Sequence, residues 1–178
     1  MFDVSPVRKE TVMDITFKAE NGKFNLRVGA LICSGGKLLL ATSPLEGEDV
    51  YYSVGGRVKY GETLYDAIKR ELREETGLDC SVVRMAALHE NFFVNVEGYP
   101  YHEISAYFLV DVSDDLAAVS SGHLTEGGPD KEHLEWIDPT DDRYTIYPPF
   151  FRDMSLWEDT ACRHYVTREE EGTTVRIS

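Results

Sequence analysis

Apolar and polar residues alternate along much of this chain, which is the pattern of half-buried β-strands. Two such runs flank Asn21-Gly22, a dipeptide that favours a two-residue hairpin, and two others flank the turn residues Gly35-Gly36. The predicted strands cover residues 14–20, 23–28 continuing into 26–33, 37–42, 51–54, 81–88, 91–96, 102–112 and 135–137.

One segment, from Leu64 to about Glu75, changes to the period of an amphipathic helix. Thr63 stands at the N-cap position with Asp66 three residues later, which resembles a capping box. Gly77 stands where many helices end in a left-handed residue. The sequence therefore specifies both ends of this helix.

A second helix is predicted to begin after Pro148-Pro149 and to run to about Trp157. Residues 113–130, rich in Ser, Gly and Asp, are predicted to form a mobile loop. Strands before, between and after two helices predict an α+β fold in which helices pack on a mixed sheet.

The first helix places acidic residues where its core-facing side should be. At about 100° per residue, one sector of about 100° contains Leu64, Tyr65, Ile68 and Leu72. Glu71 and Glu75 fall inside or beside this sector, and Glu74 lies near it. Carboxylates at a core boundary are unfavourable unless something compensates their charge.

Two interpretations account for these glutamates. A run of charges on a helix is commonly a solvated face. A hard cation such as Mg²⁺, which binds carboxylate oxygens and keeps several waters, fits their position better. Small Ala67, one turn before Glu71, is expected to leave room for a metal ion and a phosphate.

Composition limits the partners and the compartment. The 178 residues carry a net charge of −14, which disfavours nucleic-acid polymers and anionic membranes but permits a small phosphorylated substrate. The N-terminus has no signal-peptide pattern, and no apolar run is long enough to span a membrane. The three cysteines, Cys33, Cys80 and Cys162, form no CxxC pair, which favours a reducing cytoplasm. We expect one domain over residues 1–178.

The helix and its flanks complete a longer motif. Gly56 is followed after five residues by Glu62 and, after seven more, by Arg70-Glu71-Leu72-Arg73-Glu74-Glu75-Thr76-Gly77-Leu78. This segment resembles the box of the Nudix hydrolase superfamily at every fixed position. Weaker similarity extends over residues 26–137. The resemblance implies a mixed β-sheet sandwiched between α-helices and Mg²⁺-dependent hydrolysis of a diphosphate linkage, as in MutT-like enzymes.

The resemblance also implies roles for the residues of the box. Glu71, Glu74 and Glu75 would bind Mg²⁺, or Mn²⁺ in its place, and Arg70 would orient Glu71. Gly56 would permit a tight turn and a close approach of the backbone. Glu62 would either assist at the edge of the metal site or place a favourable charge at the helix N-terminus.

Further candidates lie outside the helix. Glu75 or Glu71 could take the proton of the attacking water, with Glu103 as a third candidate. Arg27, Arg57 and Lys59 could meet phosphates or be solvated surface charges. A face for stacking on a base could come from Phe92, Phe93, Tyr99, Tyr101 and Trp136. His102 is expected to be a packed histidine rather than a catalyst.

Two functions are compatible with these features. The first is a pyrophosphohydrolase acting on a nucleoside triphosphate or another nucleoside diphosphate-X. The second is a module that senses a nucleotide or ADP-ribose without cleaving it. The presence of all three box glutamates favours the enzyme, since sensors usually lack some of them. The chain gives no decisive sign of its oligomeric state; a homodimer would be compatible with it.

Overall fold

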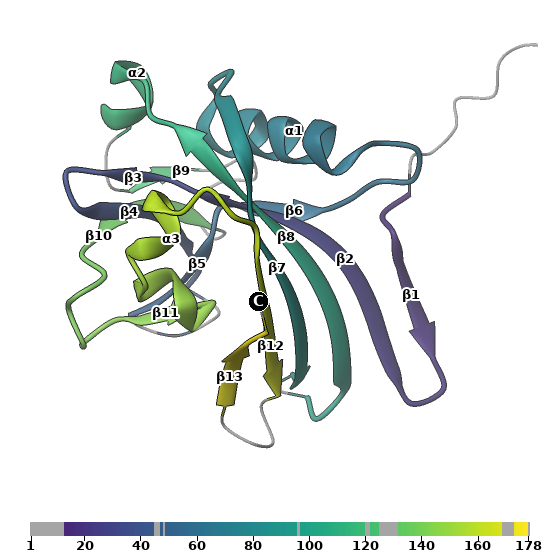
Figure 1. Cartoon of the computed structure of the whole chain (residues 1–178). Coiled ribbons are helices and arrows are strands. Elements are labelled where there is room, and N and C mark those ends of the chain that lie inside the picture. Colours follow the sequence, from purple (N-terminus) through teal and green to yellow (C-terminus); the bar gives the residue numbers. More distant parts are fainter. Residues whose placement is uncertain are drawn as a thin grey trace, which may run out of the picture.

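The computed structural model describes residues 13–44, 47, 49–95, 97–119, 122–124, 132–168 and 173–177, which form two sheets and a few helices (Figure 1). The larger sheet runs in the order β1-β2-β8-β7-β12-β13, and β6 pairs with residues 27–29 of β2. Its strands are β1 Thr16–Ala19, β2 Gly22–Leu31, β6 Gly55–Arg57, β7 Ser81–Val94, β8 Pro100–Asp111, β12 Arg163–Arg168 and β13 Thr173–Arg176. The pairing is mixed, because β2 runs parallel to β8 and antiparallel to β1 and β6.

The smaller sheet runs in the order β11-β5-β4-β10-β9, with β3 paired to β4. Its strands are β3 Cys33–Ser34, β4 Lys37–Thr42, β5 Val50–Ser53, β9 His123–Leu124, β10 His133–Ile137 and β11 Thr145–Tyr147. The helical elements are α1 Leu64–Thr76, α2 Asp114–Ala117, the 3₁₀ helix η1 Pro149–Arg152 and α3 Ser155–Glu158.

Two apolar clusters hold these layers together. On the side of the large sheet that we call the helix face, Val28 and Ala106 pack against Ile68 and Leu72 of α1. On the opposite face, Tyr107 packs against Phe150 and Phe151 of η1, whose ring centroids lie 5.6 and 5.1 Å from its own. Helices therefore lie on both sides of the large sheet, as predicted.

The strand predictions are mostly confirmed. The hairpin at Asn21-Gly22 joins β1 to β2, and the turn at Gly35-Gly36 joins β3 to β4. The two strands predicted at 81–88 and 91–96 are one strand, β7, which ends at Val94, contains two register shifts near its start and pairs with β8; residue 96 lies outside the described residues. The sequence does not predict the strands β11, β12 and β13, because these short segments show little alternation of apolar and polar residues.

Other predictions were wrong in part. The second helix is broken at Asp153, whose φ of −81° and ψ of 90° are extended. Asp153 holds that conformation because it accepts hydrogen bonds from Ser155 and from the buried Arg163. In the predicted loop 113–130, Ser113 caps α2 and Leu116 is buried, while residues 120, 121 and 125–130 lie outside the described residues.

The buried imidazole of His89 on β7 leads to a prediction about acid stability. His89 is 3% exposed, its Nε2 lies 2.8 Å from Thr167 Oγ1, and burial lowers its pKa from 6.5 to about 4. Because the unfolded chain binds this proton more readily, stability should fall as the pH drops from about 6.5 to about 4. The contribution is about 3 kcal/mol.

Urea unfolding at pH 7.0 and pH 4.5 would measure this loss. Other groups also titrate over this range, so the comparison is with His89→Gln, which cannot take up the proton. The variant should lose about 2.4 kcal/mol less between the two pH values. Equal losses in the two proteins would contradict the assignment.

Candidate functional site

The loop and helix that carry the box are fixed by local hydrogen bonds. Thr63 caps α1 by accepting a bond from the backbone N–H of Asp66, and Gly77 ends the helix in the left-handed conformation with φ 74°. Both predicted helix ends are thus confirmed. Ahead of the helix, the Glu62 carboxylate accepts a 2.6 Å bond from the backbone N–H of Lys59, which closes the loop that leaves β6.

Arg70 is the centre of the polar cluster on α1. Its guanidinium donates to Glu62 (Nη2 at 2.7 Å), to Glu71 (Nη1 at 2.6 Å) and to Glu74 (Nη1 at 3.1 Å). It also donates to the backbone carbonyl of Arg57 at 3.0 Å, which ties the helix to the end of β6. Burial alone would raise the pKa of Glu62, but the bonds from Arg70 and Lys59 lower it below the usual value.

Gly56 provides the space in which the Glu71 carboxyl group sits. A Cβ at this position would lie 2.6 Å from the carboxyl carbon and from both oxygens of Glu71. Burial raises the pKa of Glu71, although the hydrogen bond from Arg70 opposes the shift. Any residue other than glycine here would displace that carboxylate.

Glu75 is the most enclosed acid of the cluster, at 8% exposure. Its Oε1 accepts a 3.2 Å bond from the backbone N–H of Gly55, while its Oε2 is buried without a hydrogen-bond partner in the part of the chain that the structure describes. Burial, together with the negative charge of Glu132, raises the pKa of Glu75 to about 8. A buried carboxylate oxygen of this kind calls for a cation or a proton.

With this geometry in place, comparison with known proteins identifies the family. The NUDIX domain model matches residues 23–154, well over half of the 178 residues. The chain belongs to the NUDIX family. This confirms the family and the fold expected from the box.

Relatives and a solved structure agree with that family. Over 71 residues the chain is 34% identical to the NAD-capped RNA hydrolase NudC of Stutzerimonas stutzeri, covering 40% of this chain and 23% of that protein. Over 93 residues it is 33% identical to the CTP pyrophosphohydrolase of Escherichia coli, covering 51% and 66%. The fold matches the MutT protein of Bacillus halodurans with a TM-score of 0.59 at 15% identity, covering 86% and 97% of the two chains. The chain thus matches less than two thirds of the length of these curated relatives.

The carboxylates of the NUDIX box are suitable ligands for a divalent cation, although only some of them are oriented to bind one. They supply oxygen donors, which Mg²⁺ prefers, and one of these oxygens is the unpartnered Oε2 of Glu75. Within the described ranges, however, no three acidic, histidine or cysteine side chains converge as a ready metal site. The reason is that Glu71 and Glu74 turn toward Arg70. A metal would compete with this arginine for their oxygens.

The structure also corrects the expected surroundings of the helix. Ala67 is fully buried in the apolar cluster, so it leaves no room for metal or phosphate, contrary to the prediction. Tyr65, placed in the apolar sector, is 46% exposed, whereas Ala67, Ile68 and Leu72 are fully buried and Leu64 packs against the same cluster. The glutamates border this apolar stripe as predicted.

The cations outside the helix lie in different settings. Arg57 is partly exposed and pairs with Asp14 at 3.5 Å, and Lys59 lies 3.8 Å from Glu74. Arg27 on β2 pairs in register with Arg57 and lies 3.8 Å from Glu103 of β8. Arg27 therefore lies one strand away from the box, because the carbonyl of its partner Arg57 accepts a hydrogen bond from Arg70.

Sequence reasoning missed Glu132, which immediately precedes β10. Its negative charge raises the pKa values of both Glu75 and Arg27. Nothing in the sequence singles it out, because it is one of many acids in a chain with 32 Asp and Glu residues. Only the pairing of β10 with β4 brings it near α1.

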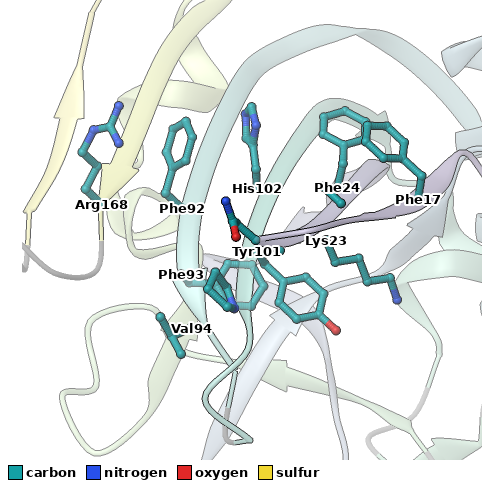
Figure 2. Close-up of a pocket in the computed structure, with 13 residues that line it drawn as sticks. Phe17, Lys23, Phe24, Phe92, Phe93, Val94, Tyr101, His102 and Arg168 are labelled. Atoms are coloured by element: carbon teal, nitrogen blue, oxygen red, sulfur yellow. The ribbon is translucent and has the colours of Figure 1, made fainter.

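A hollow of about 780 Å³ lies away from the box, at the far ends of the large sheet (Figure 2). Figure 2 shows Phe17, Phe24, His102, Phe92 and Arg168 directed to one side, and Tyr101 and Phe93 to the other. Two-residue alternation places the first set on the helix face and the second on the face of Arg27 and Glu103.

This alternation sorts the predicted aromatic candidates. Phe92 stacks on His102 at 4.3 Å, so His102 is a packed ring, as expected. Trp136 donates to the Val119 carbonyl within the core, and Tyr99 donates to the Gly22 carbonyl in the turn region. Of the five aromatic residues, Phe93 and Tyr101 share the face of Arg27, and their rings stack at 5.0 Å.

Proposed function

We propose that this protein is a Mg²⁺-dependent hydrolase of a phosphoanhydride bond in a nucleoside triphosphate or another nucleoside diphosphate-X. The observation that carries the proposal is the buried, unpartnered Oε2 of Glu75 within the complete set of box glutamates. A buried acid of this kind is unfavourable for the fold alone and useful where a cation binds.

Glu71, Glu74 and Glu75 would hold the metal, with Mn²⁺ as an alternative to Mg²⁺. When bound, the metal neutralises diphosphate oxygens and makes a water more acidic. Arg70 keeps Glu71 over Gly56 and, through Glu62, fixes the loop that follows β6. Arg57, at the end of β6, is placed to meet a phosphate oxygen of the substrate in exchange for its exposed pairing with Asp14.

Hydrolysis requires a water oxygen to bond to one phosphorus while the bond from that phosphorus to the bridging oxygen breaks. The water's proton must pass to a carboxylate of the chain. Glu71 and Glu75 remain candidates, but their oxygens are also the proposed metal ligands. The negative charge of Glu132 acts on Glu75, and Glu132 does not belong to that set, so we propose Glu132 as a further acceptor of the proton.

The similarity to the relatives supports the proposed substrate class. A MutT-like action on nucleoside triphosphates accords with the similarity to a CTP pyrophosphohydrolase. The similarity to an NAD-capped RNA hydrolase concerns a shorter segment, and the net charge of −14 disfavours a polymer as the substrate.

The three cysteines are free thiols, which fits the proposed reducing cytoplasm. Among the described residues, no helix is long and apolar enough to cross a membrane.

The test is a panel of nucleoside triphosphates, ADP-ribose and dinucleoside polyphosphates, incubated with Mg²⁺ or with EDTA, and the products identified by mass. We expect a nucleoside monophosphate together with pyrophosphate or a second monophosphate, in the Mg²⁺ samples only. Tight binding of one nucleotide without any turnover would contradict the proposed hydrolase and favour the non-catalytic sensing function. Equal turnover with EDTA would overturn the metal site.

A further inference from the structure

Glu103 is a buried acid whose surroundings consist of hydrogen-bond donors. It is 9% exposed in the middle of β8. Its Oε1 accepts from the Ser105 hydroxyl at 3.3 Å, and its Oε2 accepts from the Asn25 amide at 3.2 Å. Arg27 lies 3.8 Å from the same Oε2. A carboxylate buried in this way persists only because these groups balance its charge.

The donors are themselves held in place by strand pairing. Asn25 is 3% exposed and stands directly opposite Glu103 where β2 and β8 pair in parallel. Its Oδ1 accepts a 2.8 Å bond from the Thr16 hydroxyl on the neighbouring strand β1. A chain of contacts therefore crosses three strands, from Thr16 through Asn25 and Glu103 to Arg27. A network whose members are mostly satisfied fixes side-chain positions.

Arg27 lies at the end of this chain that is nearer the box, because it pairs across β2 and β6 with Arg57, whose backbone carbonyl accepts a hydrogen bond from Arg70. Its side chain is 36% exposed, whereas the Glu103 side chain is 11% exposed, so solvent and ligands reach the arginine rather than the acid. Burial alone would lower the pKa of Arg27, but the charges of Glu103, Glu132 and Glu75 raise it. The guanidinium is thus held among the acids of the site with part of its surface open.

We propose that Glu103 is a positioning residue, which fixes the direction of the Arg27 guanidinium so that Arg27 binds the diphosphate oxygens of the substrate. This inference rests on the proposed function. A guanidinium binds phosphate through paired hydrogen bonds, and its direction matters as much as its charge. Glu103 does not act as the base, because both of its oxygens already accept hydrogen bonds and little of it is accessible.

A double-substitution cycle with Arg27→Ala and Glu103→Gln tests this role. Glutamine keeps the size and the acceptor oxygen of Glu103 but removes the charge that fixes Arg27. We expect KM for the panel nucleotide that is turned over to rise about thirtyfold in Arg27→Ala, with kcat changed less than about threefold. Glu103→Gln should raise KM about fivefold, and the double variant should match Arg27→Ala alone.

The matched control is Glu90→Gln on β7. Glu90 is a half-buried carboxylate with a basic partner, His164 at 2.7 Å. Its side chain lies on the opposite face of the sheet from Glu103, because the neighbouring Asn91 pairs with Glu103. This variant should leave KM unchanged. If Glu103 had only a structural role, Glu103→Gln would resemble the control in KM, or its effect would multiply with that of Arg27→Ala.

The same cycle measured by calorimetry with inorganic pyrophosphate and Mg²⁺ separates this inference from the proposed hydrolysis. Pyrophosphate offers the diphosphate group without a base. Absence of nucleotide turnover, with non-additive losses of pyrophosphate affinity, would overturn the hydrolysis and keep the positioning role. Wild-type protein that does not bind pyrophosphate, or losses that multiply in the double variant, would overturn the positioning role.

Discussion

Glu75→Gln is expected to lower kcat by about a thousandfold, equivalent to about 4 kcal/mol of transition-state stabilisation. The substitution preserves the shape of a side chain that is 8% exposed, and the amide can keep one acceptor for the Gly55 N–H. It removes the negative charge that would bind the metal through Oε2, the atom without a partner among the described residues. The measurement is kcat at saturating substrate over a Mg²⁺ titration.

The metal-free stability of this variant shows whether the loss comes from the site or from the fold. Because burial raises the pKa of Glu75 to about 8, its contribution to stability is present below its usual value of 4.5 and is lost as the pH rises to about 8. Metal-free Glu75→Gln should therefore be at least as stable as wild type at pH 8.5. The exposed Glu97→Gln should leave kcat unchanged. Retained turnover in Glu75→Gln would remove Glu75 from the metal site.

The helix of the box could be predicted closely because its determinants are local. Thr63, Asp66 and Gly77 set its ends through contacts within a few residues, so sequence order alone places them. The same periodicity places Glu71 and Glu75 beside the apolar stripe, and in the structure Glu75 is buried with one oxygen that has no partner among the described residues. The sequence thus already shows a conflict: the helical periodicity places glutamates at the core boundary, where burying a carboxylate is unfavourable.

The remaining parts of the site depend on strand pairing between distant segments. Asn25 and Glu103 meet only because β2 and β8 pair in one register, and a shift of one residue would place them on opposite faces. Glu132 reaches the site through the pairing of β10 with β4. No local pattern predicts such pairings. For the same reason, the sequence suggested space beside Ala67, which the core fills.

Gly56→Ala is expected to lower kcat/KM by about a hundredfold while leaving most of the stability intact. An alanine Cβ would lie 2.6 Å from the carboxyl atoms of Glu71, so this side chain must move away from Arg70 and from the other glutamates. Displacing a metal ligand or its support commonly reduces metal affinity or activity ten- to a hundredfold. The backbone itself accepts alanine, because Gly56 is not among the glycines with a positive φ.

The control for backbone strain is Gly98→Ala. Gly98 has a φ of 79° in a turn where a Cβ would meet open space within the described structure, so alanine there costs about 1 kcal/mol through conformation alone. Thermal unfolding and Mg²⁺-dependent activity of both variants separate the two effects. Gly98→Ala should lose stability and keep its Mg²⁺ requirement, whereas Gly56→Ala should need several times more Mg²⁺ for half-maximal activity. Full activity of Gly56→Ala at the wild-type Mg²⁺ concentration would show that Glu71 works from another position, since the two groups cannot share this space.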